Sequence, residues 1–219
     1  YIRVRYQDFF LLIDAGPIGP DYLPGHGHAD TLSFELSVGV ARLIVNSGIS
    51  TYEDNQQRRW QRGTGAHSTV QINDTDSSEV WSSFRVARRA RVSALKMYHS
   101  GRGLRVSAEH DGYKRLRGSP VHQRQWSLNQ EGIRVIDRVR GCYAKFVSRF
   151  YLHPNVSISQ LTKNSGTISV DGLKLNWGVS GGSAMIKRSS WYPEFGIQQN
   201  NYCLEILGQR EQIKFDLVW

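Results

Sequence analysis

Residues 25–36 have the sequence GHGHADTLSFEL, and residues 37–46 continue it as SVGVARLIVN. From position 32 to position 38 every second residue is apolar, and a period of two is typical of a half-buried β-strand. Gly39 allows a tight turn, so the residues after it are expected to return antiparallel. This hairpin would bring Asn46 back beside the start of the first strand, near His28. A segment with two histidines therefore leads directly into a predicted sheet.

Short runs of β-forming residues recur along the whole chain, separated by turn signals such as Asp111-Gly112 and Glu131-Gly132. Residues 14–24 are rich in Gly and Pro, and they are expected to form a loop that leads to the histidines. A short helix is expected only within residues 54–62. Many short strands with almost no helix predict an all-β fold, an antiparallel β-sandwich of stacked sheets. The length of 219 residues suits one such domain, residues 1–219.

The chain has 28 Lys and Arg residues against 19 Asp and Glu residues, a formal net charge of +9 that predicts attraction to polyanions. An acidic polysaccharide fits this charge, and so does a solvated basic surface or a face turned toward an acidic companion domain. Nucleic acid is disfavoured, because the sequence has no helix rich in base-reading side chains and no compact aromatic stacking motif. No apolar run is long enough to span a membrane.

The chain begins inside a predicted strand, without Met and without a signal-like segment, so it is expected to come from a larger protein. Its two cysteines, Cys142 and Cys203, lie far apart in strand-like settings. A single disulfide and two buried thiols fit this pattern equally well.

His26 and His28 point to the same side of the chain if the backbone around them is extended, so two imidazoles can face one cavity. Imidazole near neutral pH can be a base, an acid or a metal ligand. Two surface histidines on a loop are the alternative. His67 stands at the entrance of another predicted strand, as His28 does.

Three arginines, Arg58, Arg59 and Arg62, lie on the predicted helix before His67. They can face a cleft and bind carboxylates or sulfates through paired donors, or they can be solvated helix arginines. For the nearby tyrosines, Tyr22 and Tyr52, aromatic packing on loops is the preferred interpretation.

Three segments of the chain resemble the C-terminal β-domain of heparinase II/III-like polysaccharide lyases. They are HGHADTLSF at residues 26–34, LIVNSG at residues 43–48 followed by Tyr52-Glu53, and AHSTV at residues 66–70. PEFG at residues 193–196 is similar to a loop of the family. The resemblance implies an α/α-toroid domain before the β-sandwich, absent from this chain, with the active cleft between the two. It also implies a periplasmic or secreted lyase that cleaves uronic-acid-containing acidic polysaccharide, such as glycosaminoglycan, by β-elimination.

The resemblance implies a role for four residues. His26 would lie in the catalytic cleft, and His28, Asn46 and His67 would hold a structural zinc. Asn46 departs from the family, which usually has aspartate there, and a neutral amide oxygen is a poorer zinc ligand than a carboxylate. The acid/base tyrosine would come from the toroid, so the isolated chain is expected to be inactive. A non-catalytic carbohydrate-binding or scaffolding domain is the alternative.

Overall fold

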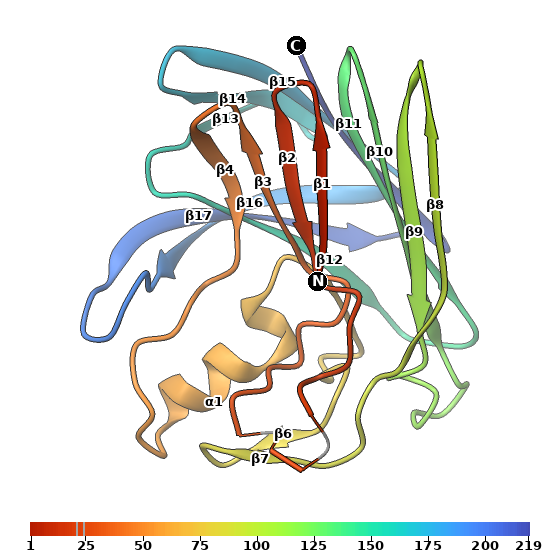
Figure 1. The fold of residues 1–219 in the computed structure, drawn as a ribbon, viewed down its shortest axis with the longest axis vertical. Coiled ribbons are helices and arrows are strands. Elements are labelled where there is room, and N and C mark those ends of the chain that lie inside the picture. The colour runs from red at the N-terminus through yellow and green to blue at the C-terminus, as the bar shows by residue number, and fades with distance from the viewer. Residues whose placement is uncertain (21, 24) are drawn as a thin grey trace.

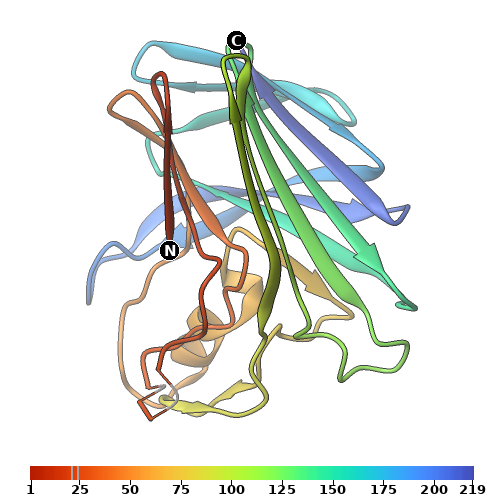
Figure 2. The same cartoon turned by 45° about the vertical axis from the view of Figure 1, so that its right-hand side comes forward.

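Two antiparallel sheets face each other in the computed structural model, which describes residues 1–20, 22–23 and 25–219 (Figures 1 and 2). The first sheet has the order β1-β2-β3-β4-β12-β17-β16, and β5 also pairs with β12. Its strands are β1 Ile2–Tyr6, β2 Phe9–Ile13, β3 Phe34–Val38, β4 Ala41–Val45, β5 Val70–Ile72, β12 Phe146–Leu152, β16 Gly182–Trp191 and β17 Gln199–Gly208. The predicted all-β fold is confirmed.

The second sheet has the order β13-β14-β15-β18-β11-β10-β9-β8. Its strands are β8 Val92–Ser100, β9 Gly103–His110, β10 Val121–Asn129, β11 Gly132–Arg140, β13 Ser157–Thr162, β14 Ser165–Val170, β15 Leu173–Ser180 and β18 Gln212–Val218. Neighbouring strands in the chain mostly pair with each other, as expected for strands joined by tight turns.

The predicted hairpin is present as β3 and β4, which pair antiparallel with Val38 opposite Ala41. Gly39 has a φ of 57° in the connecting turn, a conformation that glycine adopts without steric cost. The alternation predicted that the first strand of this hairpin begins at Leu32. In the structure, β3 begins at Phe34. Leu32 has a φ of 61° and belongs to a turn, so the apolar pattern extends beyond the strand.

The core fills the space between the sheets with side chains from both of them. Phe150 of β12 stacks on Phe215 of β18 with ring centroids 4.3 Å apart. Phe34 of β3 meets Trp126 of β10 edge to face at 6.1 Å. All four rings are buried, and removing such aromatic surface from water is the main force that holds the two sheets together.

One end of the sandwich carries the helical segments and a small hairpin (Figures 1 and 2). These elements are α1 Gln56–Arg62, the 3₁₀ turn η1 Thr64–Ala66, and the paired strands β6 Val80–Trp81 and β7 Arg85–Val86. Asn55 caps α1, because its side-chain oxygen accepts the Arg58 backbone N–H at 2.8 Å. The helix therefore lies within the predicted range. Of the predicted loop 14–24, Asp21 and Pro24 lie outside the described residues.

Both cysteines are free thiols, so the described part of the chain contains no disulfide. Cys203 is buried in β17, whereas Cys142 is exposed. Of the two alternatives, the single disulfide is therefore wrong, and two buried thiols is correct for Cys203 only. Neither α1 nor any other helix of the described residues is long and apolar enough to cross a membrane.

Candidate functional site

His26 lies at the helical end of the sandwich, exposed and surrounded by aromatic rings. Its Nδ1 atom is 3.2 Å from the hydroxyl oxygen of Tyr52. The Phe84 ring lies 6.3 Å from the imidazole and 5.6 Å from Tyr52, and Phe195 packs edge to face on Tyr52 at 4.7 Å. Between 40% and 52% of each of these three side chains is exposed, so His26 lies on an open aromatic surface.

Arg58 connects this aromatic surface to the second histidine. Its guanidinium lies over the rings of Tyr52, at 5.1 Å, and of Phe84, at 5.7 Å. Its Nη1 atom is 3.4 Å from Nε2 of His28. The side chain is buried, and Nη2 has no hydrogen-bond partner among the described residues. A cation is thus held beside the aromatic rings with one of its NH2 groups unpaired among the described residues.

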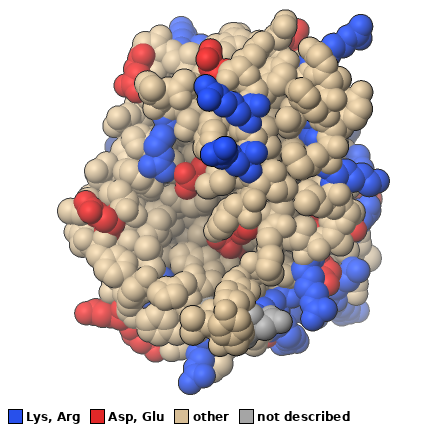
Figure 3. Space-filling view, in the orientation of Figure 1, with Lys and Arg blue, Asp and Glu red and all other residues tan. Residues whose placement is uncertain are grey.

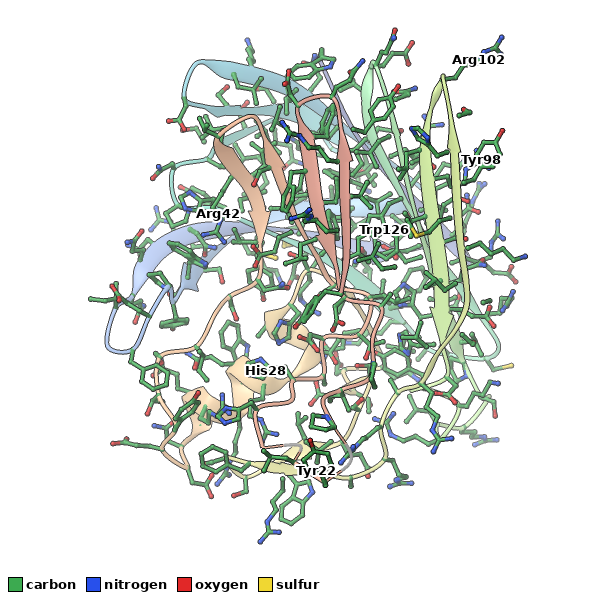
Figure 4. All side chains as sticks on the ribbon, viewed as in Figure 1. Tyr22, His28, Arg42, Tyr98, Arg102 and Trp126 are labelled. Carbon is green, nitrogen blue, oxygen red and sulfur yellow. The ribbon has the colours of Figure 1, made fainter. Side chains whose placement is uncertain are left out.

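His28 and His67 form a close pair, with Nδ1 of His28 3.2 Å from Nε2 of His67. Burial lowers the pKa of His28 well below its usual range, and His67, Arg58 and Arg62 add to this effect. Burial also lowers the pKa of His67 to about 4. Both imidazoles are therefore neutral near pH 7. The surface is hollowed at the place where His28 lies (Figures 3 and 4).

The two other helix arginines differ from Arg58. Arg62 is buried and donates to the backbone carbonyls of Gly27 at 3.1 Å, Ser82 at 3.0 Å and Arg85 at 3.1 Å. It fixes the backbone between the two histidines of residues 26–28. Arg59 is exposed and pairs with Asp54 at 3.0 Å. The structure therefore brings only Arg58 into contact with the histidine cluster through its side chain.

The sequence of the whole domain provides an independent comparison. The sequence model described as heparinase II/III-like, C-terminal, matches residues 1–214. The chain belongs to this heparinase family. No curated protein sequence matches the chain.

Solved structures with the heparinase fold cover nearly the entire chain. A heparinase III superposes with a TM-score of 0.75 at 16% identity, over 100% of this chain and 36% of the other. The heparan sulfate lyase HepC from Pedobacter heparinus gives 0.75 at 18% identity, over 96% and 33%. A 4-alpha-glucanotransferase from Thermococcus litoralis gives 0.56 at 12% identity, over 99% and 37%. At these identities the likeness shows the fold, and the chain spans about a third of each of these structures.

The donor set of a heparinase-family zinc site is only partly present. The separation of 3.2 Å between the His28 and His67 nitrogens is close to the value of about 3.3 Å for two nitrogens on one tetrahedral zinc. However, the side-chain oxygen of Asn46 accepts the Ser68 backbone N–H at 2.9 Å, and the described residues include no group of three His, Cys, Asp or Glu arranged for a metal. Arg58 adds positive charge beside His28. Two imidazoles without a carboxylate do not match a structural zinc site.

Sequence reasoning missed two features of this candidate site. Phe84 lies 58 positions after His26, in a segment without any motif, and only the fold brings it to the site. The sequence predicts that Tyr52 is a packing residue, and its ring does pack, but its hydroxyl also contacts His26. For Tyr22 the packing prediction is wrong, because 87% of its side chain is exposed (Figure 4).

Proposed function

We propose that this chain is the β-sandwich half of a periplasmic or secreted polysaccharide lyase that cleaves uronic-acid-containing acidic polysaccharide by β-elimination. The observation that carries the proposal is His26, exposed on an aromatic surface with Tyr52 at its Nδ1 atom. In β-elimination a base removes the proton at C5 of the uronic acid, and an acid protonates the leaving oxygen at C4. The C5 proton becomes acidic enough only when the neighbouring carboxylate is neutralised.

The Tyr52 contact determines which atom His26 can offer to the sugar. When the Tyr52 hydroxyl donates to Nδ1, the neutral imidazole carries its proton on Nε2. Nε2–H can then donate to the substrate carboxylate and stabilise the charge that develops there. Tyr52 is in this scheme a positioning residue, because it selects the tautomer and the orientation of the ring.

The surroundings of His26 suit a charged sugar. The open rings of Tyr52, Phe84 and Phe195 offer faces for the apolar sides of sugar rings. Arg58 lies behind two of these rings and adds positive charge without being exposed itself. This positive charge favours the binding of a polyanion.

The remaining catalytic groups would come from an N-terminal α/α-toroid domain of the same protein. Proton abstraction and leaving-group protonation need groups held within hydrogen-bond reach of one sugar ring. The structure offers one oriented histidine and one tyrosine here, and we assign the acid/base tyrosine to the toroid.

The test is the full-length protein with a panel of acidic polysaccharides, assayed by the ultraviolet absorbance of unsaturated uronate. Wild-type protein should form this product, and His26→Ala should lower kcat/KM by at least about a hundredfold, as expected for a residue that acts on charge in the transition state. His99→Ala is the matched control, because His99 is also exposed but lies on β8. Equal loss in both variants, or no product from the wild type, would overturn the proposal.

A non-catalytic carbohydrate-binding domain is the second candidate. The open aromatic surface favours it, because such a surface can bind sugar without any chemistry. In that case the full-length protein would bind the polysaccharide, and it would release no unsaturated product.

A further inference from the structure

Helix α1 faces two separate hollows. Arg58 and Arg62 turn toward the histidines, whereas Arg59 and Trp60 line a second hollow of about 440 Å³. The other walls of this hollow are strands β5, β12, β16 and β17 of the first sheet. About 41% of Trp60 is exposed, and this large aromatic side chain lines the hollow.

The walls of this hollow carry charged side chains that hold one another in place. Arg149 pairs with Glu205 at 2.9 Å and donates to the side-chain oxygen of Gln71 at 3.0 Å. Lys187 pairs with the other oxygen of Glu205 at 2.5 Å. Two cations thus share one carboxylate, and the exposed Arg188 adds a further positive charge to the same hollow.

A third hollow, of about 530 Å³, adjoins the second. Asp76 lines both hollows and therefore lies at their junction. Its carboxylate accepts the Thr64 backbone N–H at 2.7 Å, which holds the side chain in place. Trp81, which is 56% exposed, lines the far part of the third hollow together with Arg88. Trp60 also borders a fourth hollow, of about 560 Å³, beside the start of α1. These connected hollows, from Trp60 past Asp76 to Trp81, are called the Trp60–Trp81 groove below.

The groove is richer in positive than in negative charge. Its second and third hollows are lined by six basic and three acidic side chains. The basic ones are Arg59, Arg88, Arg115, Arg149, Lys187 and Arg188. Guanidinium groups bind carboxylates and sulfates through paired donors, and two open indole rings provide platforms for sugar rings.

We propose that the Trp60–Trp81 groove is a second binding surface for acidic oligosaccharide, distinct from the aromatic surface at His26. The ligand class is a chain of several sugar units with carboxylate or sulfate groups, and in this respect the inference rests on the proposed function. The connected hollows favour an extended ligand over a single sugar. A stretch of polymer held there raises the local concentration of the remainder of the same polymer.

The test is direct binding to the full-length protein in a His26→Ala background, so that turnover does not consume the ligand. The probes are a heparin-derived dodecasaccharide and a heparin-derived tetrasaccharide, measured by calorimetry. Trp60→Ala and Trp81→Ala combined should weaken dodecasaccharide binding by about tenfold or more, and Arg188→Glu should weaken it as well. The effect on the tetrasaccharide should be smaller, because a short ligand gains less from two connected sites.

The matched controls are Tyr98→Ala and Arg102→Glu. These residues are also exposed, and they lie on or beside β8, away from the groove (Figure 4). Unchanged melting temperatures check the fold. The proposal is overturned if the groove variants bind the dodecasaccharide as tightly as the controls do. A groove variant that loses only its contact with an N-terminal domain, and keeps its affinity for the dodecasaccharide, would also overturn it. Absence of unsaturated product from the wild type would count against the lyase and not against this groove.

Discussion

The molecule contains two histidine pairs with the same spacing and opposite surroundings. His28 and His67 lie 3.2 Å apart at the helical end, and His110 and His122 lie 3.2 Å apart between the sheets. The second pair is completed by a carboxylate, since Asp137 accepts from His122 at 2.8 Å. No carboxylate of the described residues is hydrogen-bonded to the first pair.

The two pairs also differ in how completely their polar atoms are satisfied. Around the core pair, Arg124 donates to both oxygens of Asp137, at 2.7 and 2.8 Å, and Ser148 donates to one of them at 2.6 Å. Around the other pair, Nδ1 of His67 and Nη2 of Arg58 have no partner within the described ranges. Buried polar atoms are normally paired, and an unpaired one in a structure needs an explanation. We interpret the core pair as structural and the His28 pair as part of a site.

The core network also supports the site from behind. Nη1 of Arg124 donates to the backbone carbonyl of Ser68 at 2.6 Å and to that of Leu32 at 2.9 Å. Ser68 directly follows His67, and Leu32 follows the segment that carries His28. One buried arginine therefore ties both histidine segments to the second sheet.

The largest effect is expected from removing the core carboxylate. Asp137→Ala should lower the free energy of unfolding by about 3–5 kcal/mol, because Arg124 and His122 would remain buried without their partner. Urea denaturation measures this change. The exposed pair of Arg134 and Asp216 is the control, and Asp216→Ala should cost at most about 1 kcal/mol. Similar losses of unfolding free energy in both variants would contradict the structural role of the Asp137 network.

Acid should destabilise the protein through the same core pair. Burial lowers the pKa of His110 and of His122, the latter despite Asp137, so both are neutral in the folded state. Unfolded histidine takes up a proton below about pH 6.5, so stability is full above this pH and falls as the pH decreases. Each histidine contributes a slope of about 1.4 kcal/mol per pH unit below about pH 6.5. His110→Gln should reduce the slope, and an unchanged slope would contradict the neutral core pair.

A smaller effect is expected at the site itself. Tyr52→Phe keeps the ring and removes the hydroxyl that contacts His26, so kcat should fall by about tenfold with little change in stability. The pH profile of kcat should shift, because the tautomer of His26 is no longer selected. Tyr202→Phe is the control, since Tyr202 is similarly exposed on β17. A loss in kcat with an unchanged pH profile would argue against the positioning role.

The smallest change concerns metal content. Asn46→Asp would place a carboxylate beside the histidine pair and make its surroundings more like those of the core pair. Purified wild-type protein should contain well below one zinc per chain, and the variant should contain clearly more, because a carboxylate is a better zinc ligand and offsets charge. Elemental analysis after dialysis measures the zinc content of both proteins. Equal zinc in the two proteins would show that Asn46 does not limit the site.

The sequence predicted the strands and the helix, but it missed many of the side-chain contacts between them. The period of two before Gly39 predicted the β3–β4 hairpin correctly, because alternation reports directly which face of a strand is buried. It placed the strand start at Leu32, since a buried apolar residue in a turn looks the same in sequence as one in a strand.

The candidate site shows the same limit. The motifs located His26 and His67. They could not show that the Arg62 guanidinium donates its hydrogen bonds to backbone carbonyls far away in the sequence. Nor did any local pattern mark Phe84 or Asp137 as neighbours of the histidines. Such contacts depend on chain segments that only the packed sheets bring together.

The most direct test of the account compares the isolated 219-residue chain with the full-length protein on the same acidic polysaccharide. Because we propose that the chemistry is divided between two domains, the isolated chain should fold and release no unsaturated uronate, whereas the full-length protein should release it. Circular dichroism dominated by β-structure confirms that the isolated chain is folded. Product formed by the isolated chain at the rate of the full-length protein would contradict the account, and it would place the whole catalytic apparatus around His26 and Tyr52.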